Sequence, residues 1–153
     1  MTANTDYLIS QMRVLTMREQ PFFYVTSAPT VIASLDDELG RLMPLLEAAQ
    51  VEAHVGDGAP IIIRYYPTGE ADTFLMEVGI PVKVEARPAG EAQVKTLPPY
   101  RCAALLHWGS LEHIQEAYNI LMQAIKDAGL AQGPEGREWY YHFEGDNLSL
   151  IHI

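Results

Sequence analysis

A single glutamate lies inside the richest aromatic run of the chain and is the first candidate for chemistry. Glu138 is followed by Trp139, Tyr140, Tyr141 and His142, and a Gly-Pro turn signal stands shortly before it. A carboxylate enclosed among rings must find a partner for its charge, or its pKa will shift. Such a group can pair with a cationic ligand, activate a water molecule or stabilise a positive charge that develops during a reaction.

Alternation along the chain assigns these side chains to two faces. The run is rich in strong strand formers and follows a turn signal, so it is predicted to be a short strand in which successive side chains point to opposite sides. Glu138, Tyr140 and His142 then share one face. We expect the other face to pack in the core, and it carries Trp139, Tyr141 and Phe143.

Ring side chains elsewhere complete the candidate site. A flat aromatic cation gains about 0.5–2 kcal/mol from each ring face that covers it, and a buried carboxylate pairs with its charge. The first ring candidates beside the glutamate are Tyr66, Tyr140 and Trp108. Tyr65 and Trp139 are second candidates, because an error of one residue in strand register exchanges the two faces. If the site catalysed a reaction, Glu138 and Tyr140 would be its catalytic pair.

Composition bounds the classes of function. The chain has 153 residues, 48% of them hydrophobic and 20% charged, which fits a single globular domain with a sizeable core. Its net charge of −10 disfavours direct nucleic-acid binding, because affinity for phosphates depends on clustered lysine and arginine, and it favours cationic or neutral partners.

Cysteine usage and the start of the chain bear on its compartment. The single cysteine, Cys102, allows no internal disulfide, and no secretory signal or membrane span is recognisable, so we expect a cytoplasmic protein. We also expect no cofactor and no metal ion. No phosphate-binding loop is present, and His107 and His142 stand alone, without the ligand spacing of a metal site.

The elements that position the candidate site begin with an N-terminal arm, residues 1–20. Apolar residues over 5–18 follow a helix-like or irregular amphipathic spacing. The domain proper is predicted to run from residue 21 to residue 153. Its first strand covers residues 22–25 and continues over 31–35 after a bend at a proline.

A helix and further strands follow. Pro44 lies inside a run of leucines at helical spacing, so the regular helix is predicted to start near Arg41, where proline in the first turn is tolerated. The chain then predicts two strands, a linker, a proline-interrupted strand, a second helix and two final strands. These elements cover residues 61–66, 73–82, 85–91, 94–106, 111–128, 138–143 and 148–153.

The same order of elements occurs twice. Two proline pairs align the copies, 70 and 74 positions apart: Pro29 with Pro99, and Pro60 with Pro134. The second helix region is therefore predicted to be longer by about four residues, or one helical turn. Counting from the second pair sets Arg64 opposite Glu138, and Tyr66 opposite Tyr140. An arginine in the same cavity would neutralise the glutamate by an ion pair.

The repeat predicts the fold class. The halves, about residues 21–84 and 92–153, each read β-α-β-β. We expect an α+β domain of duplicated units with pseudo-two-fold symmetry, antiparallel sheets, helices on one face and a ligand cleft between the halves.

Several segments resemble one known family. They are residues 77–82, 97–100, 103–109, 117–121, 133–134 and 138–140. These segments look like those of the GyrI-like small-molecule-binding family, which includes the effector-binding domains of multidrug-sensing MerR-type and AraC-type regulators. The resemblance covers residues 21–153 and implies a pocket between two β-α-β-β halves, in which the acid matching Glu138 meets cationic aromatic ligands.

The sequence and the resemblance leave three functions open. The first, which we favour, is a stand-alone protein that holds hydrophobic, often cationic aromatic ligands in a cleft with a central glutamate. The second is a hydrolase of strained cyclopropane-bearing genotoxic compounds, as some members of the family are. The third is a protein-interaction modulator similar to the gyrase-inhibiting members. The DNA-binding module of the fused regulators is missing from the sequence, so no direct contact with nucleic acid is expected.

Overall fold

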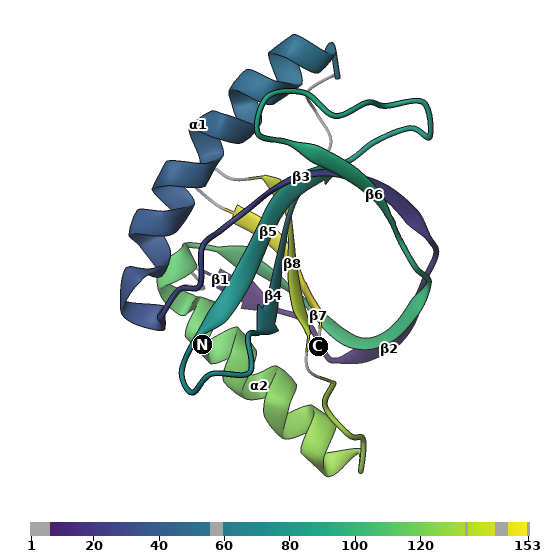
Figure 1. The fold of residues 1–153 in the computed structure, drawn as a ribbon. Coiled ribbons are helices and arrows are strands. Elements are labelled where there is room, and N and C mark those ends of the chain that lie inside the picture. Colours follow the sequence, from purple (N-terminus) through teal and green to yellow (C-terminus); the bar gives the residue numbers. More distant parts are fainter. Residues whose placement is uncertain (1–6, 56–59, 134, 143–146, 153) are drawn as a thin grey trace.

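The computed structural model describes residues 7–55, 60–133, 135–142 and 147–152, and Figure 1 shows their fold. Two units with the same order of elements make up most of it. The first unit contains β3 (Gln20–Thr26), α1 (Leu35–Ala53), β4 (Ile61–Pro67) and β5 (Phe74–Pro81). The second contains β7 (Tyr100–Gly109), α2 (Ile114–Asp127), β8 (Gly136–His142) and β9 (Asn147–His152). The predicted α+β fold of duplicated β-α-β-β units is confirmed.

Shorter elements flank these two units. The additional strands are β1 (Tyr7–Ile9), β2 (Arg13–Met17) and β6 (Gln93–Leu97), and the 3₁₀ turns η1 (Ile32–Ser34) and η2 (Leu111–His113) lead into the helices. The sheet has the order β1-β7-β9-β8-β4-β5-β3-β6, and β2 also pairs with β7. The halves meet where β4 pairs with β8. In Figure 1, β3 with β6 and β2 with β7 arch round, so that the sheet is strongly curled.

Both helices cover the same face of the sheet. α1 packs against β3, β4 and β5 through a cluster that includes Leu42, Leu46, Phe23, Ile63 and Val78. α2 packs against β7 through Ala117, Leu121, Ile125, Ala103 and Leu105. Burial of one large aliphatic side chain is worth about 1.5–3 kcal/mol, so these two clusters fix both helices to the sheet. No helix in the described part of the chain is long and apolar enough to cross a membrane.

The N-terminal arm differs from its predicted helix-like form. β1 and β2 are strands, and they pair with β7 along the edge that β9 leaves open. An edge strand exposes unpaired N–H and C=O groups, and pairing with the arm satisfies them. The hydrogen bonds gained by pairing with β7 outweigh the weak helix preference of residues 5–18. Residues 5 and 6 lie outside the described part of the chain.

The first helix also differs from the prediction. Residues 32–34 form η1 instead of a strand, and α1 starts at Leu35, so that Pro44 lies inside it. Three acidic residues, Asp36 to Glu38, occupy the first turn, where they favour the positive end of the helix dipole. Pro44 removes one backbone hydrogen bond, but the flanking Leu42 and Leu46 are each 1% exposed, and their burial holds the helix together.

The repeat is real, but its proline alignment is wrong. Leu35 and Ile114 start the two helices and lie 79 positions apart, not 70, so Pro29 does not correspond to Pro99. Pro29 follows the first strand of its half, whereas Pro99 precedes that of the other. The second helix is also shorter, with 14 residues against 19. The equivalence of Pro60 and Pro134 cannot be compared, because Pro134 lies outside the described residues.

Candidate functional site

The two halves meet at one seam, the pairing of β4 with β8, and its register decides which side chains lie together. β4 and β8 are antiparallel, with Ile63 directly opposite Glu138 and Ile61 directly opposite Tyr140. Direct partners in a sheet share a face, and Ile63 packs under α1, so Glu138 and Tyr140 lie on the helix-covered face. The prediction that they share a face is confirmed.

The predicted core face is wrong. Tyr140 is 7% exposed and belongs to the core cluster under α1, whereas Tyr141 is 48% exposed. Trp139 packs on the other side of the sheet against the cluster of Phe22 and Tyr24. Both faces of the sheet are therefore apolar here, so composition alone could not choose between them. Phe143 and the side chain of His142 lie outside the described part of the chain.

The predicted partners across the seam are wrong. Ile63, not Arg64, stands opposite Glu138, and Ile61, not Tyr66, stands opposite Tyr140. Arg64 is one residue from Ile63 and Tyr66 is five residues from Ile61, so alternation along the strand places Arg64 and Tyr66 on the other face of the sheet. Tyr65, a second candidate from the sequence, is therefore the β4 tyrosine on the face of Glu138.

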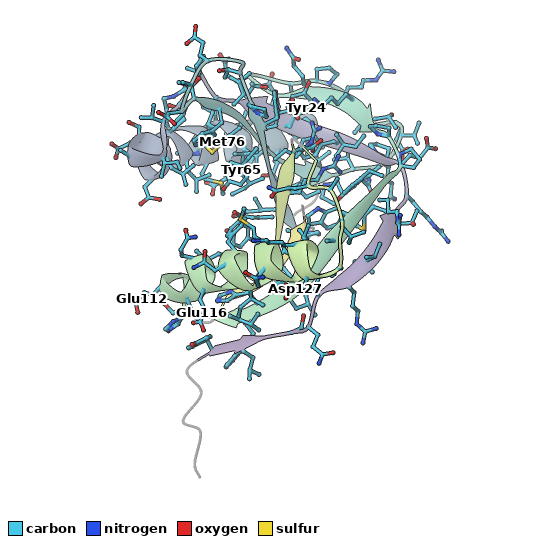
Figure 2. All side chains as sticks on the ribbon, turned by 90° about the horizontal axis from the view of Figure 1, so that it is seen from below. Tyr24, Tyr65, Met76, Glu112, Glu116 and Asp127 are labelled. Carbon is cyan, nitrogen blue, oxygen red and sulfur yellow. The ribbon has the colours of Figure 1, made fainter. Side chains whose placement is uncertain are left out.

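Three phenol groups surround the carboxyl group of Glu138, which is 6% exposed. Tyr118 of α2 donates a hydrogen bond to Oε2, and Tyr140 donates one to Oε1. Tyr65 of β4 donates to the same Oε1 at 3.3 Å. Each half of the fold contributes to the cluster. In Figure 2, α2 lies below the first half, with Glu116 and Asp127 labelled beside it. Tyr65 is labelled on the side of the first half that faces α2.

The electrostatics of this cluster follow from its burial. Burial raises the pKa of Glu138, and the hydrogen bonds from the three phenols offset that rise only in part. Burial also raises the pKa of Tyr65 and of Tyr118 well above the ordinary value, and the nearby carboxylate adds to the rise in each case. The phenols therefore keep their protons at neutral pH and act as hydrogen-bond donors to the acid.

Three members of the cluster, Tyr65, Tyr118 and Glu138, line a cleft of about 470 Å³. Its walls are mostly apolar and come from both halves and both helices. The lining residues include Ile32, Leu35, Tyr65, Phe74, Tyr118, Met122, Tyr66, Glu135 and Gly136. A concave apolar site with a few convergent polar groups is the usual form of a small-molecule site.

A second hollow, of about 560 Å³, lies between the end of α1 and the turn after β5. Its lining mixes Lys83, Glu85 and Arg87, and it contains neither Glu138 nor any ring candidate. The chemistry of the chain is therefore concentrated in the cleft between the helices.

Tyr118 is the site residue that sequence reasoning missed. It lies in a segment that resembles the family, but it was not singled out. A usable signal existed, because Tyr118 is next to Ala117 and three residues before Leu121, both of which face the sheet. A polar-tipped ring on the border of an apolar helix stripe reaches the edge of the core.

Arg64 does not neutralise the acid. It lies on the other face, where it pairs with Glu77 and donates to Glu135 over 2.6 Å. Arg137 donates to the same oxygen of Glu135 over 2.6 Å, and Lys95 pairs with Glu77 over 2.5 Å. Burial opposes ionisation of Glu135, but the hydrogen bonds from both arginines outweigh it and lower its pKa. Among the described residues, none of these cations pairs with Glu138.

The remaining ring candidates lie apart from the cluster. Tyr66 points to the face of Arg64 and donates to Glu77 over 3.1 Å, although it also lines part of the cleft. Trp108 is 38% exposed on β7, opposite Leu8 of β1, and is not among the residues that line the cleft. The structure thus brings together Glu138, Tyr140 and Tyr65, and separates them from Trp108 and Trp139.

A duplicated α+β domain with a concave, mostly apolar cleft lined by both halves has the form of a small-molecule-binding domain. The model of one family of such domains, the GyrI-like small molecule binding domain, matches residues 11–149. The chain therefore belongs to the GyrI-like family, as the resemblance of its segments predicted.

Solved structures show the same fold at low sequence identity. The C-terminal domain of EcmrR is 15% identical, with a TM-score of 0.70 over 94% of this chain and 95% of that one. SAV2435 bound to tetraphenylphosphonium is 10% identical, with a TM-score of 0.70 over 94% of this chain and 92% of that one. A hydrolase from Listeria innocua is 8% identical, with a TM-score of 0.58 over 93% of this chain and 90% of that one. The comparison with curated proteins found no match.

Proposed function

We propose that this domain binds hydrophobic cations, often aromatic ones, in the cleft between its helices, with Glu138 as the group that recognises the positive charge. The proposal is carried by one observation: Glu138 is 6% exposed and is held by phenols, while Arg64 and Arg137 pair with other acids. A buried carboxylate without a counter-charge is costly, and a cationic ligand supplies that charge. The net charge of −10 also attracts cations toward the protein.

The walls of the cleft suit the apolar part of such a ligand. Tyr65, Tyr118 and Phe74 offer ring faces or edges, and Leu35 and Met122 offer flexible aliphatic surface. Rings accept many flat shapes, whereas a single carboxylate selects the sign of a charge and not an outline. We therefore expect broad specificity among apolar cations and weak binding of anions.

Glu138→Gln tests the proposal, because it keeps the shape and the hydrogen-bond acceptor but removes the charge. Loss of one partner of a desolvated charge pair should weaken binding of tetraphenylphosphonium by roughly 2–5 kcal/mol. Titration calorimetry with the wild type and the variant measures this difference. Triphenylphosphine oxide, a neutral compound with similar rings, is the matched control and should lose little. Equal losses for both compounds, or no loss for either, would contradict the proposal.

A hydrolase is the second candidate, and the raised pKa of Glu138 favours it. A carboxyl group with a raised pKa can donate its proton to a strained electrophile, and Tyr118 or Tyr140 can relay or stabilise charge beside it. Mass analysis of a cyclopropane-bearing compound after incubation separates the candidates. A binding protein returns the compound unchanged, whereas a hydrolase adds water to it, and Glu138→Gln then abolishes turnover while substrate still binds.

A further inference from the structure

The two oxygens of the Glu138 carboxyl group have different partners. Oε1 accepts hydrogen bonds from Tyr140 and Tyr65, which both stand on strands of the sheet. Oε2 is in contact with the hydroxyl of Tyr118 on α2. A phenol can accept a hydrogen bond as well as donate one, so the Oε2 contact also allows a proton on Oε2 that is donated to the Tyr118 oxygen. The geometry therefore gives a proton a defined place.

The surroundings favour the protonated acid when the cleft is empty. Among the described residues, the hydrogen-bond partners of the carboxyl group are the phenols of Tyr65, Tyr140 and Tyr118. The other acid that lines the cleft, Glu135, is paired with Arg64 and Arg137. α1 adds a negative charge, Asp36, whose field acts on Tyr65, and the β9 residue in register with Glu138 is Ile151. Burial of an ionised carboxylate without a cation is unfavourable, and the raised pKa of Glu138 agrees with this.

Building on the proposed function, we infer that the cleft exchanges a proton for its ligand. When the cleft is empty, the Glu138 carboxyl group keeps a proton on Oε2. When a cationic ligand binds, that proton leaves to solvent and the carboxylate pairs with the ligand. One positive charge enters and one leaves, so the buried site is never left with a net charge.

This exchange makes ligand affinity depend on pH with a defined sign. Below the pKa of the empty site, each ligand that binds must first remove a proton, so affinity falls by about tenfold for each pH unit of acidification. Above that pKa the carboxylate is already ionised, and affinity is independent of pH. The protein therefore holds its ligand more weakly in acid.

Calorimetry with tetraphenylphosphonium tests the exchange, because the charge of this ion is permanent and cannot itself titrate. Titrations over about pH 4.5 to 8, each in two buffers of different ionisation enthalpy, should show release of about one proton per ligand on the acid side and of none on the alkaline side. Triphenylphosphine oxide should release none at any pH. In the ligand-free protein, the side-chain carboxyl carbon of Glu138, assigned in ¹³C spectra by its loss in Glu138→Gln, should titrate above the ordinary range of glutamate.

Two variants locate the proton. Glu138→Gln should abolish proton release and flatten the pH profile of whatever binding is left, whereas Asp36→Asn, which removes the α1 carboxylate whose field acts on Tyr65, should keep both. Binding of tetraphenylphosphonium without proton release at every pH overturns the inference and leaves the proposed function intact. Failure of the ion to bind at any pH overturns the proposed function as well, so the two failures can be told apart.

Discussion

Two buried carboxylates on opposite faces of one sheet are held in opposite ways. Glu77 of β5 is 3% exposed and Glu138 of β8 is 6% exposed, so they lie at similar depth. Glu77 pairs with Arg64 and Lys95, and the Tyr66 hydroxyl adds a further hydrogen bond. Glu138 is held by phenols alone in the described part of the chain. Depth therefore does not distinguish the two acids, but charge balance does.

The two arrangements have different uses. The network of Glu77 continues through Arg64 to Glu135 and from there to Arg137, so it joins the two halves across the seam of β4 and β8. Each of these acids has cationic partners, and the network needs no ligand. The Glu138 cluster satisfies hydrogen bonding but leaves the charge of an ionised acid unmatched. One face of the seam is thus built for stability, and the other carries the site that we propose for the ligand.

Loss of Glu77 should have the largest effect on stability. Glu77→Gln leaves Arg64 and Lys95 without their shared acid, and removal of one partner of a buried pair costs roughly 3–5 kcal/mol of unfolding free energy. Glu138→Gln, the matched change on the other face, leaves no cation unpaired and should cost less than about 1 kcal/mol. Urea unfolding of both variants at neutral pH measures the difference. Equal costs would mean that the two acids have the same structural role.

Much of this architecture was predictable from the sequence, because the residue patterns that specify it extend over whole strands or helices and lie within one element. Strands 61–66 and 73–82 follow from β-branched and aromatic runs bounded by glycine and proline, and the second helix follows from regular apolar spacing. The face shared by Glu138 and Tyr140 follows from strand alternation alone. These features depend on neighbours within one element, which a sequence displays directly.

The rest depended on contacts between distant elements. Which residue faces Glu138 across the seam is set by the register of β4 and β8, and counting from the prolines put Arg64 and Tyr66 where Ile63 and Ile61 lie. The proline pair 70 positions apart failed because residues flanking a strand on opposite sides were matched. Tyr118 was missed because α2 brings it over the sheet from 20 positions away in sequence. Strand pairing and helix packing, and not the secondary-structure propensity of single residues, determine which side chains surround Glu138.

Loss of one phenol should have an intermediate effect that changes with pH. Tyr140→Phe removes a hydrogen bond to Glu138, which is worth about 1.5–3 kcal/mol when the acid is ionised and about 0.5–1.5 kcal/mol when it is protonated. The stability cost should therefore grow as pH rises through the raised pKa of Glu138. Tyr66→Phe is the counterpart on the other face, where Glu77 keeps Arg64 and Lys95.

Urea unfolding at several pH values tests this pair of variants. The sign follows from the carboxyl group, because a folded pKa above the unfolded one means that stability falls as pH rises between the two values. Tyr140→Phe raises that folded pKa further and steepens the fall, whereas Tyr66→Phe should leave the pH profile of the wild type unchanged. A Tyr140→Phe cost that stays constant with pH would show that the phenol does not respond to the charge of Glu138.

The smallest effect should come from a ring that the structure places outside the cleft. Trp108→Ser removes the largest exposed ring of β7, yet Trp108 is not among the lining residues, so binding of tetraphenylphosphonium should change by less than about 0.5 kcal/mol. Tyr65→Leu removes a ring of the cleft itself and should cost about 0.5–2 kcal/mol of affinity, the range of one cation-π contact. Tyr65→Phe, which keeps the ring, should recover most of that loss. A larger loss from Trp108→Ser than from Tyr65→Leu would move the binding site to the face of the sheet opposite the helices, which carries Glu77 and not Glu138.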